Sequence, residues 1–116
     1  MDADQTAALV DAVRAAVAAR RALRIVGGNG KAFLGRTTAV ADPLPVATHR
    51  GIVTYEPQEL VITARAGTPL ADIEAALAQH GQMLAFEPPR YSAHATLGGT
   101  IACNLSGPRR PYAGAA

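Results

Sequence analysis

Two glycine clusters carry the chemistry that this sequence can perform. The first, Gly27-Gly28-Asn29-Gly30-Lys31, follows a short apolar run, and the second is Gly98-Gly99. Glycine and asparagine let the backbone take positive φ and turn its N–H groups inward, which forms a concavity that holds a phosphate. We interpret the first cluster as a diphosphate cradle and the second as the other half of the same site.

Each cluster also fits a purely structural role. The first has neither the GxxxxGK[ST] loop nor a GxGxxG fingerprint that leads into a helix, so a plain tight turn accounts for it about as well. The second lies among small residues, from Ala95 to Asn104, that allow a flat group to approach the backbone. Close packing of a helix on a sheet accounts for this second pattern equally well.

The composition excludes several classes of function. The chain has 116 residues, of which 49% are hydrophobic, so it is one small domain or a piece of a larger protein. Its net charge is +2, and the charged residues are scattered without the basic stripe and stacking aromatics that bind nucleic acid.

A single cysteine, Cys103, excludes an internal disulfide and fits a reducing compartment. With no apolar run long enough to span a membrane and no signal peptide, we expect a cytoplasmic protein.

Local patterns in the first half predict one helix and three strands. A helix is expected over 4–20, with a buried stripe formed by Leu9, Val10, Val13 and Val17. A buried strand over 22–26 would lead directly into the first glycine cluster. Two prolines indicate an irregular or edge segment over 37–47. The segments 51–55 and 60–66 are typical of two strands joined by a turn.

The second half begins with a helix start signal. Thr68 is expected to cap a helix whose first residue is Pro69 and which Gly81 ends. Its buried stripe would consist of Leu70, Ile73, Ala76 and Leu77. His80 is expected to be an exposed residue at the helix end rather than a ligand, and 83–85 is strand-like.

Four stretches of this sequence occur in a recognisable order, namely 27–36, 55–68, 80–89 and 96–112. On these residues the chain resembles the N-terminal FAD-binding region of the vanillyl-alcohol oxidase and p-cresol methylhydroxylase (PCMH) type flavoproteins. Within that family it is most similar to the FAD-binding subunits of bacterial glycolate oxidase complexes. The runs Lys-Ala-Phe-Leu-Gly and Ser-Gly-Pro-Arg-Arg-Pro favour that subgroup.

The resemblance implies an α+β fold, the FAD-binding domain of the PCMH type, with two α/β subdomains. The first would span 1–57, and the second would span 58–116 and be incomplete, with FAD extended between them. FAD would be bound non-covalently, because no histidine lies in the glycine-rich turn. The residues implied in cofactor binding are Val26, Gly27, Gly28, Asn29, Gly30, Lys31, Thr96, Gly98, Gly99, Ala102 and Tyr112.

Some of these contacts have alternatives. Lys31 is either a point charge for the phosphates or a solvated loop lysine, and we favour the second. Tyr112 matches a Tyr-Gly position of the family, but Ala113 follows it here. His94 is expected to be a surface loop residue. Arg109 and Arg110 could clamp a carboxylate, although a solvated pair or a subunit contact is preferred.

For the parent protein the resemblance implies an FAD-dependent oxidoreductase that oxidises a small 2-hydroxy acid. The reaction would convert glycolate to glyoxylate with hydride transfer to flavin N5, and no catalytic residue is assigned. The implied partners are a sister flavin subunit and an iron–sulfur subunit, through which the protein could attach peripherally to the inner membrane. The alternatives are a non-catalytic FAD-binding assembly subunit and another flavoprotein of the family, such as a D-lactate dehydrogenase. Because the family continues with a cap domain, this chain is expected to be a fragment.

Overall fold

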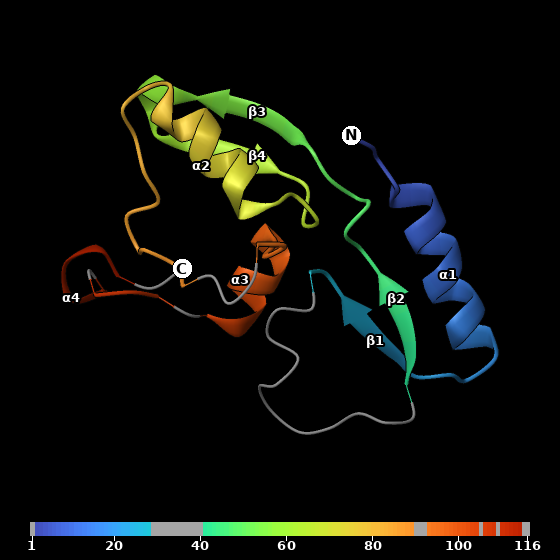
Figure 1. Cartoon of the computed structure of the whole chain (residues 1–116). Coiled ribbons are helices and arrows are strands. Elements are labelled where there is room, and N and C mark those ends of the chain that lie inside the picture. The colour runs from blue at the N-terminus through green and yellow to red at the C-terminus, as the bar shows by residue number, and fades with distance from the viewer. Residues whose placement is uncertain (1, 29–40, 90–92, 105, 109, 115–116) are drawn as a thin grey trace.

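The computed structural model describes residues 2–28, 41–89, 93–104, 106–108 and 110–114. Over these residues the fold is α+β, with short helices and two separate two-stranded sheets (Figure 1). In chain order the elements are α1 (Thr6–Ala18), β1 (Leu23–Val26), β2 (Asp42–Pro45), β3 (Ile52–Glu56), the 3₁₀ turn η1 (Pro57–Glu59), β4 (Val61–Ala64), α2 (Leu70–Ala78), α3 (Leu97–Cys103) and α4 (Arg110–Ala113).

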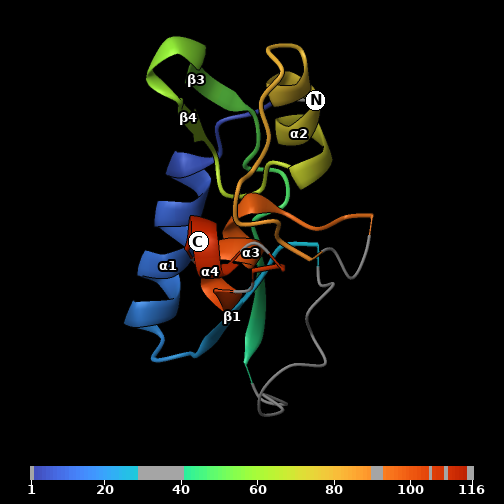
Figure 2. The ribbon, with the colours of Figure 1, turned by 90° about the vertical axis from the view of Figure 1, so that its left-hand side faces the viewer.

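The first sheet is a parallel pair flanked by α1. Strands β1 and β2 run from Leu23 opposite Asp42 to Val26 opposite Pro45. Proline is tolerated in β2 because a strand with only one partner has a free edge on which no N–H is needed. Both views place α1 alongside this sheet (Figures 1 and 2). The segment over 37–47, expected to be irregular or an edge, therefore contributes an edge strand.

Helix α1 forms where the sequence predicts it, but its buried face differs from the prediction. Ala16 is buried, at 2% exposure, whereas Val10, Val13 and Val17 are exposed at 40%, 43% and 72%. A small alanine side chain lets the helix axis lie closer to its neighbours than a valine would. The expected valine stripe is therefore wrong for the described chain, although the helix itself is confirmed.

The second sheet is an antiparallel hairpin, and α2 carries the core beside it. Strand β3 pairs with β4 from Ile52 opposite Ala64 to Glu56 opposite Val61, with η1 as the turn. Leu70 and Ile73 are fully buried and Leu77 is 5% exposed, which confirms three residues of the predicted apolar stripe of α2, whereas the fourth, Ala76, is half-buried. Gly81 has φ +64°, and Gln82 N–H donates to Leu77 O, so the predicted glycine stop is confirmed.

Thr68 does not cap α2, which corrects the predicted helix start. The N-cap position is Pro69, and no side chain caps this helix. Thr68 is 1% exposed, and its Oγ1 accepts from Gly51 N–H at 3.0 Å while donating to Arg65 O at 2.6 Å. Its hydroxyl therefore joins the start of the β3 strand to the end of β4, because those backbone groups would otherwise be buried without partners.

Residues 83–85 form a loop and not the strand that the sequence suggests. The preceding Gln82 explains the difference. Its Nε2 donates to Pro57 O at 2.8 Å, and its Oε1 accepts from Tyr55 Oη. Side-chain bonds thus hold this segment against the hairpin in place of a backbone ladder.

Helix α3 lies between the β1–β2 sheet on one side and the β3–β4 hairpin with α2 on the other, in both views (Figures 1 and 2). Backbone hydrogen bonds fasten its start to the segment before α2. Leu97 N–H donates to Thr68 O at 2.9 Å, and Gly98 N–H donates to Ala66 O at 2.8 Å. Leu70 N–H donates in turn to Ala95 O at 2.9 Å. The second glycine cluster is therefore placed by the segment that links β4 to α2.

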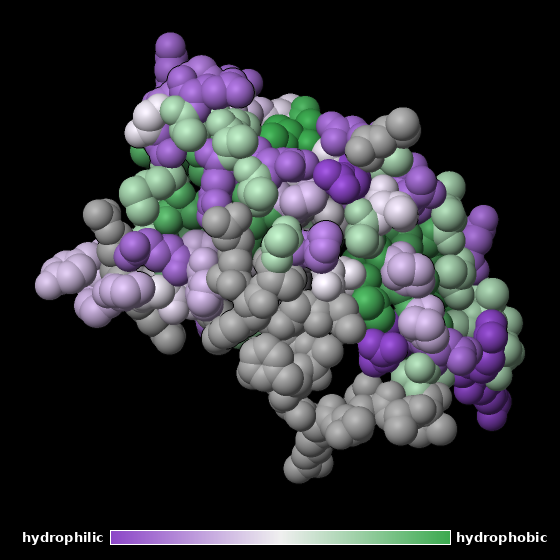
Figure 3. Space-filling view, viewed as in Figure 1, coloured by the Kyte–Doolittle hydropathy of each residue, from purple (hydrophilic) through white to green (hydrophobic). Residues whose placement is uncertain are grey.

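Several large apolar side chains remain exposed on this chain. Ile25 is 73% exposed and Leu60 is 78% exposed, and on the visible face hydrophobic residues are interspersed among polar ones (Figure 3). The strand expected over 22–26 therefore forms as β1, but the expectation that it is buried is wrong. None of the helices in the described part of the chain has the length and apolar content that crossing a bilayer requires.

Candidate functional site

The first glycine cluster meets the segment that leads into the second. A Cβ on Gly27 would lie 2.7 Å from Thr96 Oγ1, and a Cβ on Gly28 would lie 1.8 Å from His94 O. Only residues without a side chain allow backbone segments to approach so closely. The end of β1 therefore packs directly on the segment that leads into α3. The remainder of the first cluster, Asn29, Gly30 and Lys31, lies outside the described residues.

A pocket of about 300 Å³ opens at this junction. Four stretches of chain line it, and bare glycine backbone contributes to two of them. A Cβ on Gly67 would lie 2.2 Å from Val46 O, so this glycine too is required by a close backbone approach. The residues that line the pocket are Gly27, Gly28, Ala47, Arg50, Gly67, Pro69, Ala93, His94 and Thr96.

Gly98 and Gly99, which form the second glycine cluster, do not line this pocket as described and are linked to it through Thr96. Thr96 is 4% exposed and caps α3, because its Oγ1 accepts from Gly99 N–H at 3.2 Å. Gly98 packs on Ala66, with 2.9 Å between its ideal Cβ and that of Ala66. Gly98 and Gly99 thus shape the entry of α3, and Thr96 connects them to the pocket wall.

The remaining residues expected in the site lie farther out. Val26 O, at the end of β1, accepts from Val46 N–H at 2.8 Å, so this carbonyl is already occupied. Ala102 is exposed on α3, and Tyr112 is 93% exposed on α4. None of these three lines the pocket as described. Of the two arginines considered as carboxylate clamps, Arg109 and the side chain of Arg110 lie outside the described residues.

The positive charge in the pocket comes from Arg50, which no pattern in the sequence singles out. Its Nη2 forms an ion pair with Asp72 Oδ2 at 3.1 Å, and its Nε is buried with no hydrogen-bond partner among the described residues. Arg50 lies in the loop between β2 and β3, and Asp72 lies 22 residues farther along the chain. No local pattern could reveal this pairing, because loop arginines are common and both the pocket and the partner are distant in sequence.

These features fit part of a dinucleotide cofactor. The ideal Cβ atoms of Gly27 and Gly28 would overlap neighbouring atoms, so their bare backbone forms a close-set wall. Backbone N–H groups and a guanidinium are the donors that a diphosphate requires. The adjoining α2 and hairpin give the pocket a rigid side through the bonds of Thr68.

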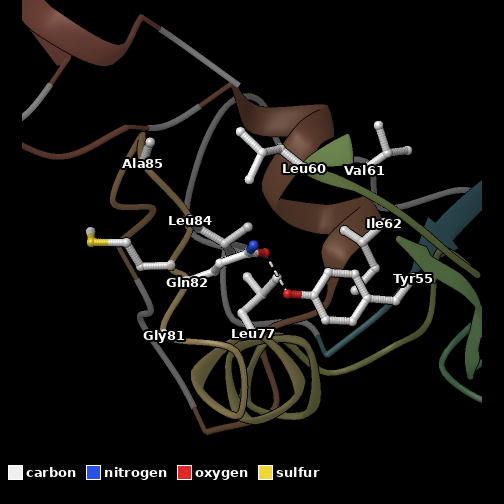
Figure 4. A pocket seen from close by; sticks show the side chains of 10 residues that line it. Tyr55, Leu60, Val61, Ile62, Leu77, Gly81, Gln82, Leu84 and Ala85 are labelled. Atoms are coloured by element: carbon white, nitrogen blue, oxygen red, sulfur yellow. Dashed lines mark hydrogen bonds between the residues drawn. The ribbon is translucent and has the colours of Figure 1, made fainter. Parts of the chain in front are cut away.

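A second pocket, of about 420 Å³, lies between the hairpin and the segment after α2 (Figure 4). Its walls are largely hydrocarbon, and its polar side chains, Tyr55 and Gln82, are bonded to each other. The exposed His80 packs edge-on against the Tyr55 ring, with 5.3 Å between the ring centroids. This pocket therefore offers shape but no group poised for chemistry. It is lined by Tyr55, Leu60, Val61, Ile62, Leu77, Gly81, Gln82, Met83, Leu84 and Ala85.

Comparisons with known proteins agree with this geometry. A model of the family described as FAD binding domain matches residues 2–116. Glycolate oxidase subunit GlcE of Escherichia coli (strain K12) is 54% identical to the chain over 113 residues. The match covers 97% of this chain and 32% of that protein, so the chain spans about a third of the length of this curated relative. Because the family model extends over almost the entire sequence, the chain belongs to the FAD binding domain family, and FAD is the cofactor that its fold serves.

Proposed function

We propose that this chain is the FAD-binding portion of a flavin-dependent oxidoreductase that converts glycolate to glyoxylate. The convergence of Gly27 and Gly28 on the segment from His94 to Thr96, around one pocket, is the observation that carries the proposal. The similarity to a glycolate oxidase subunit supports the choice of substrate. When bound, FAD supplies the acceptor for a hydride at flavin N5.

The role of this chain is to bind and orient the cofactor. Backbone N–H groups from Val26 to Lys31 would hold the pyrophosphate, since a dianionic group needs several donors at short range. Thr96, Gly98, Gly99 and Ala102 would lie along the ribityl and pyrophosphate side, and Tyr112 would add a separate contact to the cofactor. We propose non-covalent binding, because the first glycine cluster contains no histidine.

We further propose that FAD lies between two subdomains, 1–57 and 58–116. The first would contain α1 and the β1–β2 sheet, and the second would contain β4, α2 and α3. Position 57 lies in the turn of the β3–β4 hairpin, so the two units would share this hairpin as their connection.

The relative's name describes a subunit, so we propose that the parent protein works in a multi-subunit glycolate oxidase. Its partners would be a sister flavin subunit and an iron–sulfur subunit. Attachment to the inner membrane would then be peripheral and would depend on those partners.

The proposal is tested on the purified full-length parent protein by visible spectroscopy with and without glycolate. We expect flavin absorption that glycolate bleaches and that D-lactate bleaches less. A protein without flavin absorption would contradict the cofactor assignment. Flavin that glycolate leaves oxidised would contradict the proposed activity and favour a non-catalytic assembly subunit.

Matched variants connect this experiment to the pocket. Gly28→Val should lower the flavin content of the purified parent, because the added side chain collides with the His94 carbonyl. Val53→Thr, which changes a side chain that is 52% exposed on β3, should leave the flavin content unchanged. Equal flavin content in both variants would show that the cofactor does not occupy this pocket.

A further inference from the structure

We propose that Arg50 binds the diphosphate of FAD, as a charged contact that complements the glycine backbone. This inference rests on the proposed function, because it assigns a specific residue to the cofactor site. It starts from the placement of Arg50 in the pocket wall beside Gly27 and Gly28.

The backbone of Arg50 is held on both sides. Arg50 N–H donates to Ala3 O at 3.1 Å, and Ala3 N–H donates to Arg50 O at 3.0 Å. Arg65 Nη1 donates to the same Arg50 carbonyl at 3.4 Å. The next residue is fixed as well, since Gly51 N–H donates to Thr68 Oγ1. The side chain therefore starts from a rigid position, as expected for a residue that must present its charge at a defined place.

The guanidinium of Arg50 has unused donor capacity. It carries five N–H donors, and Asp72 engages it through Nη2. Its Nε is buried and has no partner among the described residues. The side chain is 31% exposed, so the donors for a phosphate oxygen are those of its Nη groups that Asp72 leaves free, and not the buried Nε. Asp72 engages one of the two Nη groups, Nη2.

The charge balance of the pocket favours an anionic ligand. Among the described residues, none of those that line it carries a carboxylate, and Arg50 is the one permanently charged lining residue, although Asp72 outside the lining pairs with it. Gly27, Gly28 and Gly67 contribute bare backbone to the pocket wall, and Asp72 already engages one Nη group of Arg50. A diphosphate supplies the negative charge that matches the guanidinium.

The simplest competing hypothesis gives Arg50 a purely structural role. In that case it would serve only to pair with Asp72, whose side chain is 50% exposed. Asp72→Asn breaks this ion pair but leaves the guanidinium in the pocket wall. It is therefore the matched control for Arg50→Met, which removes the ion pair and the guanidinium together.

The test measures FAD affinity of the full-length parent apoprotein by flavin fluorescence titration. We expect Arg50→Met to weaken FAD binding about tenfold or more, since charge-assisted contacts to phosphate are strong. Arg50→Lys should lose less, because lysine keeps the charge without the fork. Asp72→Asn should stay close to wild type. Competition by ADP, which carries the adenosine diphosphate part of FAD without the flavin, should weaken in Arg50→Met in parallel with FAD.

Salt dependence provides a readout that a structural role would not change. The affinity of wild type and Asp72→Asn for FAD should fall as salt is raised, and this slope should be shallower in Arg50→Met. Unchanged FAD affinity in Arg50→Met, or equal losses in Arg50→Met and Asp72→Asn, would overturn the inference alone. A wild-type parent that binds no FAD would overturn the proposed function instead, and this inference with it.

Discussion

At the scale of single residues, the site depends on positions that carry no side chain. Gly28 and Gly99 differ sharply in this respect. An ideal Cβ on Gly28 would lie 1.8 Å from His94 O, whereas the nearest atom to a Cβ on Gly99 is Thr96 Oγ1 at 3.2 Å. The first glycine is required by a backbone neighbour that cannot rotate away, and the second faces a side chain that can adjust.

Gly28→Ala is therefore expected to lower the free energy of unfolding by about 1–3 kcal/mol, the usual cost of overpacking. Gly99→Ala is the matched control, because it adds the same methyl group inside α3, where alanine is the better helix former. Urea unfolding of the two variants measures the difference. Equal stabilities would show that the contact between Gly28 and the His94 carbonyl does not exist in solution.

The carboxylate of Asp4 makes pH-dependent interactions at the start of α1. Its pKa is lowered from 3.8, chiefly because its carboxylate accepts a hydrogen bond from Thr6 Oγ1 and also one from Thr6 N–H. The positive charge of Arg65, with Nη2 3.7 Å from Asp4 Oδ2, adds a smaller effect. Since the native pKa lies below the unfolded one, the ionised form stabilises the folded state.

This stabilisation should be complete above a pH of about 4 and should disappear as pH falls through the lowered native pKa. Asp4→Asn is expected to remove that part of the pH dependence. Asp11→Asn, which removes an exposed carboxylate within α1, should retain it. The measurement is the midpoint of chemical unfolding as a function of pH from neutrality down to acid. A wild-type slope in the Asp4→Asn variant would contradict the assignment.

At the scale of elements, α1 and α2 end in the same geometry with different residues. Arg20 takes the left-handed conformation after α1, with φ 54°, and Arg21 N–H donates to Ala16 O at 2.9 Å. Gly81 occupies the equivalent place after α2, with φ 64°. Glycine takes this conformation without cost, whereas a residue with a Cβ is strained there.

Arg20→Gly is accordingly expected to raise the free energy of unfolding, and Gly81→Ala to lower it, each by about 1 kcal/mol. The opposite signs are the test, since both substitutions act on the same turn type. Thermal and urea unfolding would report them. A stabilising Gly81→Ala would show that the turn after α2 does not take this conformation in solution.

The sequence predicted those elements whose signals are local. The helix before Arg20, the strand that enters Gly27 and the stop at Gly81 all follow from periodicity or from glycine and proline within a few residues. The buried face of α1 was not predicted, because alanine and valine give nearly equal apolar signals and only tertiary contacts decide that Ala16 is buried.

The features that escaped prediction are long-range. The sequence around Thr68 is typical of a helix cap. In the structure its hydroxyl bonds instead to Gly51, 17 residues away, at the start of the hairpin. The role of Arg50 could not be predicted either, because its pocket is assembled from four separate stretches of chain. Glycine spacing could suggest that two clusters share a site, but not which loop supplies the charge.

At the scale of the whole molecule, the described chain buries little apolar surface for its length. Its radius of gyration is 15.5 Å, against about 13 Å for a compact domain of this size. Each of its sheets has two strands, and such pairs are marginal unless more strands or a helix cover them. Val61 and Met83, both 54% exposed, lie on the second pocket and add to the uncovered apolar surface.

Residues 1–116 alone should therefore bind FAD about tenfold or more weakly than the full-length parent, because a loosely covered fold must be ordered when the cofactor binds. Flavin fluorescence titration of the two proteins gives the comparison. A dye that reports exposed apolar surface should also bind the isolated chain more strongly than the parent. Equal FAD affinities would show that residues 1–116 alone preorganise the glycine pocket and that their exposed apolar side chains do not weaken FAD binding.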